Sequence, residues 1–189
     1  MKLPKAIIVG NSGNVLKEEK GEFIDSFDVI IRCNNYKIKS YEKFVGSRTD
    51  ILCIHRKAWN YELSDDIKEV WLWGERDFHS WGERDARGDL IPIFKPKETC
   101  PIIRLVEEDL FSCIPKIDRQ LIYIPSTGMY AISNGVKKYK KAYTYGIDGF
   151  KSDRHHYWDS DVTTNKYHKV SREREIIKLM NEDNFIESI

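Results

Sequence analysis

The strongest constraint on the fold of this chain is a series of short apolar runs that end abruptly in polar or turn-forming residues. The first run spans residues 5–10 and leads into the turn Asn11-Ser12-Gly13-Asn14. Runs of the same kind predict further strands at 27–32, 50–54, 69–73, 120–124 and 142–145. Because apolar residues fill these runs without a polar alternation, the strands suit the interior of a parallel sheet.

Helical patterns separate the later strands. Apolar residues recur at helical spacing within 100–117, 128–139 and 171–181, and Ser126 and Thr127 precede the second segment as N-cap residues do. Strands alternating with helices predict an α/β fold, and 189 residues suit one domain covering 1–189. Ligands of such sheets bind beyond the carboxyl ends of the strands, where the turn at 11–14 would lie.

Composition and charge narrow the function classes. A hydrophobic content of 41% and a charged content of 32% indicate a folded globular protein. The net charge of +1 argues against nucleic acid as a partner, and no apolar run is long enough for a transmembrane segment, which leaves peripheral membrane association at most. The four cysteines lack C-x-x-C spacing, so we expect neither a zinc site nor a redox pair, and we expect a cytoplasmic location.

The first turn admits two interpretations from its residues alone. Its glycine spacing matches neither G-x-G-x-x-G nor the P-loop, and no lysine follows. Backbone N–H groups at the end of a strand are able to hold a phosphate. A plain Asn-Gly turn explains the same residues equally well.

Four motifs in order resemble those of the sialyltransferases, glycosyltransferase family 29. The long sialyl motif is matched by V-G-N-S-G-N at 9–14, I-D-S-F-D at 24–28, R-x-N at 32–34 and G-S-R-T-D at 46–50. The short motif is similar to P-S-T-G-M at 125–129 followed by Tyr145-Gly146. The third motif resembles H-Y-W-D at 156–159, and the very short motif resembles His168-x4-Glu173.

This resemblance implies a Rossmann-like, mostly parallel sheet flanked by helices, in a GT-A-like variant. It also implies an inverting transfer of sialic acid from CMP-sialic acid to a glycan hydroxyl, with a CMP-sugar and a glycan acceptor as partners. The donor-binding residues would be Asn11, Ser12, Gly13, Asn34, Ser126, Thr127, Gly128 and His156. Carboxamides suit the nucleotide because they donate and accept hydrogen bonds, and the start of a helix suits the carboxylate of the donor.

The catalytic residues that the resemblance implies are two histidines. His168 is the candidate general base, because an imidazole with a pKa of about 6.5 is available at neutral pH. His156 would hydrogen-bond the departing phosphate, Tyr157 would support it, and Glu173 would anchor its own segment or orient the base. By themselves, residues 155–158 suit a buried aromatic cluster better, and His168 suits a surface histidine better. The other motifs reverse both preferences.

Metal and cofactor are not expected. Asp159-Ser160-Asp161 has the D-x-D pattern that binds a divalent cation in many nucleotide-sugar transferases. A CMP leaving group carries a single phosphate, which a histidine and N–H groups can stabilise, so we interpret the D-x-D as coincidental.

Several departures and alternatives complete the hypothesis. The bridging cysteines of the family are replaced here by Ala6 and Tyr139, as a reducing cytosol permits, and we expect a short bacterial or viral version. A transferase for CMP-Kdo or another CMP-nonulosonic acid, or a non-catalytic CMP-sugar-binding protein, remains an alternative. The twice-occurring W-G-E-R-D, at 73–77 and 81–85, is expected in a surface loop, and contact with the substrate is one interpretation of that loop.

Overall fold

The protein is built on one parallel sheet. The computed structural model describes residues 2–55, 66–73, 102–105, 125–154, 156–159 and 170–189. Its seven strands are β1 (Ala6–Val9), β2 (Val29–Cys33), β3 (Ile51–His55), β4 (Glu69–Trp73), β5 (Ile102–Leu105), β6 (Ala142–Tyr145) and β7 (Ile186–Ser188). Every pair of neighbouring strands is parallel, in the order β5-β4-β3-β2-β1-β6-β7.

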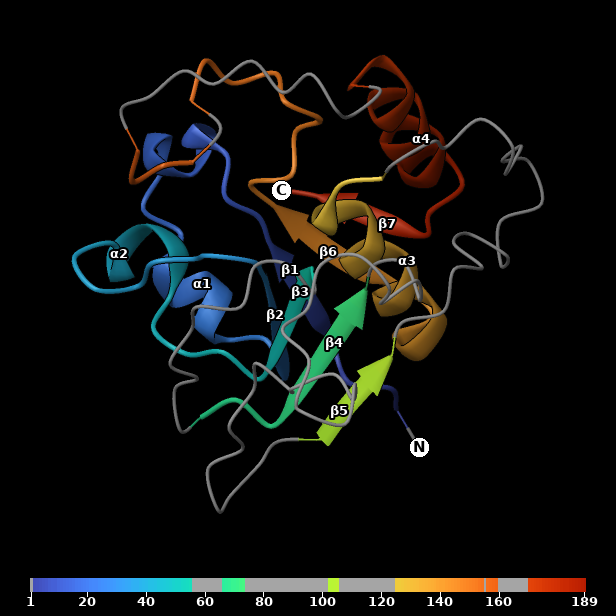
Figure 1. The fold of residues 1–189 in the computed structure, drawn as a ribbon, viewed down its shortest axis with the longest axis horizontal. Coiled ribbons are helices and arrows are strands. Elements are labelled where there is room, and N and C mark those ends of the chain that lie inside the picture. The colour runs from blue at the N-terminus through green and yellow to red at the C-terminus, as the bar shows by residue number, and fades with distance from the viewer. Residues whose placement is uncertain (1, 56–65, 74–101, 106–124, 155, 160–169) are drawn as a thin grey trace, which may run out of the picture.

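The strand order reverses at β1. The chain proceeds outward from β1 through β2 to β5 and then returns to β6 on the other side of β1 (Figure 1). Such a reversal leaves a switch point between β1 and β6 at the carboxyl edge of the sheet, which is where ligands of open α/β sheets bind. The predicted Rossmann-like α/β class is confirmed.

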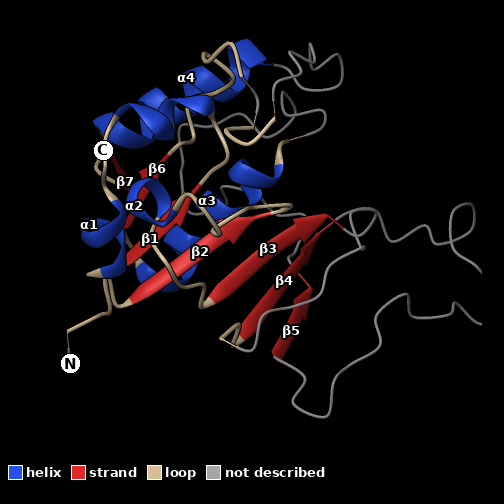
Figure 2. Ribbon diagram, turned by 90° about the vertical axis from the view of Figure 1, so that its left-hand side faces the viewer, coloured by secondary structure: helices blue, strands red, loops and turns tan. Residues whose placement is uncertain are grey.

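Helices cover both faces of the sheet because the strands alternate the direction of their apolar side chains (Figure 2). Helices α3 (Thr127–Tyr139) and α4 (Val170–Glu182) pack on the face that carries Ile8 and Ile31. The 3-10 helix η1 (Gly13–Lys17) and the short helices α1 (Gly21–Asp25) and α2 (Glu42–Val45) pack on the face that carries Ile7 and Ile30. Both faces are therefore buried, as the uninterrupted apolar runs predict.

Most of the expected elements are confirmed, and one is wrong. The strands expected near 5–10, 27–32, 50–54, 69–73 and 142–145 and the helices expected over 128–139 and 171–181 are present. The helix expected over 100–117 is contradicted at its start, because Ile102–Leu105 forms β5 and pairs with β4. The strand expected at 120–124 lies outside the described residues.

Among the residues that the structure describes, no helix combines the length and the apolar character needed to cross a bilayer.

Candidate functional site

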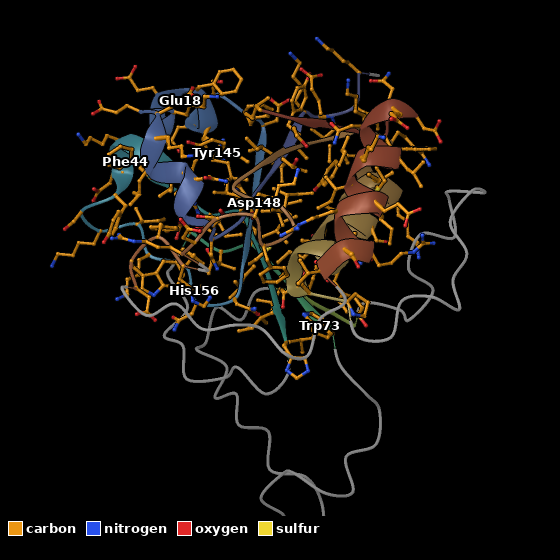
Figure 3. The ribbon with its side chains drawn as sticks, turned by 90° about the horizontal axis from the view of Figure 1, so that it is seen from above. Glu18, Phe44, Trp73, Tyr145, Asp148 and His156 are labelled. Atoms are coloured by element: carbon orange, nitrogen blue, oxygen red, sulfur yellow. The ribbon has the colours of Figure 1, made fainter. Side chains whose placement is uncertain are left out.

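The candidate site lies at the carboxyl edge of the sheet, where polar residues follow β1, β2 and β6. The turns after β1 and β6 touch, because Gly10 N donates to Tyr145 O at 2.7 Å and a Cβ on Gly10 would lie 2.3 Å from Gly146 O. Only glycine permits this approach of two backbones. Seen from above, Asp148 lies centrally between the helices on the two faces, and His156 and Trp73 lie to the same side of it (Figure 3).

Asn11, directly after β1, offers one hydrogen-bond acceptor. Its Nδ2 donates to the backbone oxygen of Cys33 at 2.9 Å, which fixes the orientation of the amide because a carbonyl can only accept. The remaining atom, Oδ1, is buried and has no hydrogen-bond partner among the described residues. A buried acceptor without a donor is costly, so this atom suits a ligand hydroxyl or amine.

Asn34, directly after β2, has the opposite polarity. Its Oδ1 accepts from the backbone N–H of His55 at 3.2 Å and from the hydroxyl of Thr127 at 3.1 Å. Within the described part of the chain, no hydrogen bond leaves its Nδ2, and the side chain is half-buried. Asn34 therefore has an N–H donor to offer a ligand, and its backbone φ of +45° places it in the left-handed region that asparagine tolerates.

The start of α3 is tied to both β4 and α4. Ser126 is its N-cap, and both its N–H and its hydroxyl donate to the buried carboxylate of Glu173, at 2.7 and 2.8 Å. Thr127 Oγ1 accepts from Trp73 Nε1 at 3.0 Å. A Cβ on Gly128 would meet its nearest neighbour, Ile147, at 3.4 Å, which is an ordinary van der Waals contact, so packing does not require a glycine there.

The Ser12 hydroxyl and the Gly13 N–H both donate hydrogen bonds to oxygen atoms of the protein. The hydroxyl of Ser12 donates to Asp148 Oδ2 at 2.8 Å, and the N–H of Gly13 donates to Arg154 O at 3.0 Å. Asp148 Oδ2 also accepts from Asn14 Nδ2 at 2.6 Å and from the N–H of Ser152 at 3.0 Å. The first turn is thus braced against the segment after β6, and the predicted donor-binding roles of Ser12 and Gly13 stay predictions.

The third motif is anchored on the segments that follow the first two strands. Tyr157 N donates to Asn11 O at 2.9 Å, the Tyr157 hydroxyl donates to Lys37 O, and it accepts from Lys37 N at 3.0 Å. Burial raises the pKa of Tyr157 to about 12, so the phenol is neutral at physiological pH. The ring of His156 stacks on Trp158 with centroids 4.9 Å apart, which restricts the orientation of the imidazole.

The structure therefore brings Asn11, Asn34, Thr127 and Tyr157 together, and Glu173 joins them through Ser126. His168 and Asp161 lie outside the described residues. In the part of the chain that is described, no three His, Cys, Asp or Glu side chains form a group suited to a metal ion.

Part of the long motif serves the scaffold. Arg32 is fully buried and donates to the backbone oxygens of Val45 and Arg48 and to the Thr49 hydroxyl, while burial lowers its pKa. Asp50 accepts from Ile30 N at 2.9 Å and from Lys68 at 2.7 Å. These residues fix β2 against β3 and so position Asn34.

Sequence reasoning missed three residues that position the site. Asp148 follows β6 by three residues, and a polar residue just beyond a predicted strand is a signal that was available. Arg174 donates to the backbone oxygens of Gly149 and Phe150, each at 2.8 Å, and so holds the same loop from α4. Trp73 belongs both to the strand expected at 69–73 and to the W-G-E-R-D expected in a surface loop; it is the buried last residue of β4, so the strand is confirmed for it and the loop is wrong.

Comparisons with known proteins support the resemblance stated from the motifs. Residues 2–79 match the model of glycosyltransferase family 29 (sialyltransferase). The human type 2 lactosamine alpha-2,3-sialyltransferase is 27% identical over 210 residues, which cover 96% of this chain and 63% of that protein. A beta-1,6-galactosyltransferase, GALT29A, from Arabidopsis thaliana is 23% identical over 209 residues, covering 88% and 48%.

Solved structures show the same fold. The crystal structure of a mammalian sialyltransferase in complex with Gal-beta-1-3GalNAc-ortho-nitrophenol superposes with a TM-score of 0.73 at 21% identity, over 99% of this chain and 69% of that one. The chain spans less than two thirds of the length of the curated relatives described above. The predicted resemblance to family 29 is confirmed by these matches.

Proposed function

We propose that this chain, whose residues 2–79 match the sialyltransferase family model, is an inverting glycosyltransferase that moves sialic acid from CMP-sialic acid to a glycan hydroxyl. The observation that carries the proposal is the convergence of Asn11, Asn34, Thr127 and Tyr157 at the carboxyl edge of the sheet. These residues come from three of the four motifs. A glycan acceptor is proposed because the similar proteins include sialyltransferases named for lactosamine and a structure holding Gal-beta-1-3GalNAc.

The two asparagines suit different parts of a nucleoside monophosphate. The N–H donor of Asn34 matches a phosphate oxygen, because an ionised phosphate offers hydrogen-bond acceptors and no donors. The buried acceptor of Asn11 matches a ribose hydroxyl or the exocyclic amine of cytosine. Asn11 thus offers an acceptor to the donor groups of the nucleoside, and Asn34 offers a donor to the acceptor groups of the phosphate.

Two histidines carry the proposed chemistry. His168 removes the proton of the attacking glycan hydroxyl, and His156 donates a hydrogen bond to the phosphate as the bond to the sugar breaks. The start of α3, at Thr127 and Gly128, would present the positive end of a helix to the donor carboxylate. We assign no cation, because the leaving group carries a single phosphate and these hydrogen-bond donors can stabilise the charge that it develops as the bond to the sugar breaks.

A cytoplasmic location is part of the proposal. The positions of the family's bridging cysteines are Ala6 and Tyr139, and both residues pack in the core shared by β1 and α3. Cys33 and Cys53 are buried free thiols, which suits a reducing compartment.

A different sugar is the second candidate. The similarity to a protein named beta-1,6-galactosyltransferase shows that this sequence pattern is shared with a transferase named for another sugar. The nucleotide-facing residues likewise do not distinguish sialic acid from Kdo or another nonulosonic acid. A non-catalytic CMP-sugar-binding protein would retain the nucleotide site and lack turnover.

The test is the release of CMP from CMP-sialic acid, measured with and without a lactosamine acceptor. We expect release that depends on the acceptor, survives EDTA and falls roughly 10²–10⁴-fold in His168→Ala, as general-base removal does. CMP binding by His168→Ala should be normal. Turnover only with CMP-Kdo or with an activated galactose would support one of the alternative sugars. Binding of CMP-sialic acid without turnover would support the non-catalytic protein. A protein that neither binds nor turns over CMP-sialic acid would overturn the proposal.

A further inference from the structure

Trp73 belongs to a chain of hydrogen bonds that ends at Asn34. Its Nε1 donates to Thr127 Oγ1 at 3.0 Å, and Thr127 Oγ1 donates to Asn34 Oδ1 at 3.1 Å. The residues come from the end of β4, the start of α3 and the position directly after β2. We refer to these three residues as the relay.

The direction of each hydrogen bond in the relay is forced. An indole Nε1–H only donates, so Thr127 Oγ1 must accept from it and the single hydroxyl proton is left for the next partner. The next partner is Asn34, and the backbone N–H of His55, 3.2 Å from the interacting atom of Asn34, requires that atom to be an oxygen. An amide oxygen only accepts, so the proton between the two side chains is the hydroxyl proton of Thr127.

Packing holds the relay still. The indole of Trp73 is stacked on Tyr130 with ring centroids 4.1 Å apart and meets the His55 ring edge-on at 4.3 Å. Trp73 and Thr127 are 7% and 5% exposed, so neither the indole N–H nor the hydroxyl has ready access to solvent. Rotation of either side chain would leave a buried donor unpaired, which is costly.

We propose that Trp73 is a positioning residue that acts through Thr127 to hold Asn34 with its amide N–H₂ toward the ligand. The inference rests on the proposed function, because it assigns Asn34 to the phosphate of a nucleoside monophosphate. It also leaves the Thr127 hydroxyl no proton to donate to an anionic ligand, since that proton is used within the relay. A flipped Asn34 amide would present an oxygen to the phosphate and repel it.

The chain offers a matched control two residues away. Trp71 lies on the same strand, packs in the same core cluster and is 2% exposed. Its Nε1 also donates a hydrogen bond, to Glu69 Oε1 at 2.7 Å, at the start of β4 and away from the carboxyl edge. Trp71→Phe and Trp73→Phe thus each remove one buried indole hydrogen bond, and only the second is connected to Asn34.

The experiment compares the affinities for CMP and for cytidine, which lacks the phosphate, by calorimetry on the full chain. In Trp73→Phe we expect CMP affinity to fall roughly 3- to 10-fold, the loss of about one hydrogen bond, with less than about a twofold change for cytidine. Thr127→Val should lose more CMP affinity, and Thr127→Ser, which keeps the hydroxyl, should restore it. Trp71→Phe should leave the ratio of the two affinities unchanged although it lowers the melting temperature.

A ligand-free measurement separates this inference from the proposed function. The Asn34 side-chain amide and the indole N–H of Trp73 give assignable nitrogen–proton NMR signals. Slow exchange of the indole N–H and a large shift of the Asn34 amide signal in Thr127→Val support the relay, even if the wild-type protein binds no CMP. An Asn34 signal that is unchanged in Thr127→Val, or an equal loss of CMP preference in Trp71→Phe and Trp73→Phe, overturns it.

Discussion

At the residue scale, the two asparagines differ in what they present to a ligand although they are chemically identical. Asn34→Asp replaces the free N–H₂ with a carboxylate oxygen, so we expect CMP affinity to fall at least tenfold while cytidine affinity changes little. Asn11→Ala removes the buried acceptor, so CMP and cytidine should both lose affinity, by about 1–3 kcal/mol.

Calorimetry with both ligands on both variants provides the measurement. Equal effects of Asn34→Asp on CMP and cytidine would show that Asn34 does not face the phosphate. A loss confined to CMP in Asn11→Ala would place the acceptor of Asn11 away from the nucleoside.

The positions of these residues were predictable from the sequence, and their polarity was not. Asn11 and Asn34 directly follow apolar strands, which places them at one edge of a parallel sheet. Which atom of each amide is left for a ligand depends on partners elsewhere, Cys33 O for Asn11 and Thr127 for Asn34. The same holds for Ser12, whose hydroxyl donates to Asp148, 136 residues away.

At the scale of elements, one carboxylate braces the turn after β1 against the segment after β6. Asp148 accepts from Ser12, Asn14 and Ser152, and that segment continues into His156. Asp148→Ala should therefore cost about 1–3 kcal/mol of the free energy of unfolding and also weaken CMP binding, because both sides of the site lose their link.

Asp25→Ala is the matched control for Asp148→Ala. Asp25 accepts from the N–H and the hydroxyl of Ser47, at 2.8 to 2.9 Å, in the turn before β3 and thus at the opposite edge of the sheet. Urea unfolding should show a comparable loss of stability in both variants. Calorimetry should show weaker CMP binding only in Asp148→Ala, and equal CMP affinities in the two variants would reduce Asp148 to a purely structural role.

The strands that lie inside the sheet were predicted correctly, and the two strands at its edges were not. Strands β1 to β4 and β6 lie inside the sheet and consist of apolar runs that the sequence displays openly. The edge strand β7 has one buried residue, Ile186, followed by exposed Glu187 and Ser188, so it lacks such a run. β5, at the other edge, was assigned to a helix because its few apolar residues also fit the helical spacing of 100–117.

At the scale of the whole molecule, the central sheet buries ionisable groups that must stay neutral. Cys33 and Cys53 are register partners on β2 and β3, and burial raises the pKa of Cys33 to about 12 and that of Cys53 well above its ordinary value. Burial also raises the pKa of Tyr145 and of Tyr157 to about 12. The thiols face α3, and the two tyrosines pack with η1, α1 and α2, so both layers depend on neutral groups.

Alkaline pH should therefore destabilise the fold before any of these groups ionises in the native state. In the unfolded chain, thiols lose their protons near pH 8.5 and phenols near pH 10, whereas the native groups hold theirs to about pH 12. Because the unfolded state then binds fewer protons than the native state, the free energy of unfolding falls as pH rises from about 9 to about 12. Urea unfolding at pH values from about 7.5 to 11, under reductant, should show this fall, with a shallower slope above pH 10 in Tyr157→Phe. A free energy of unfolding that is constant from pH 9 to 11 would mean that these groups ionise equally in both states, and that their burial does not hold them neutral.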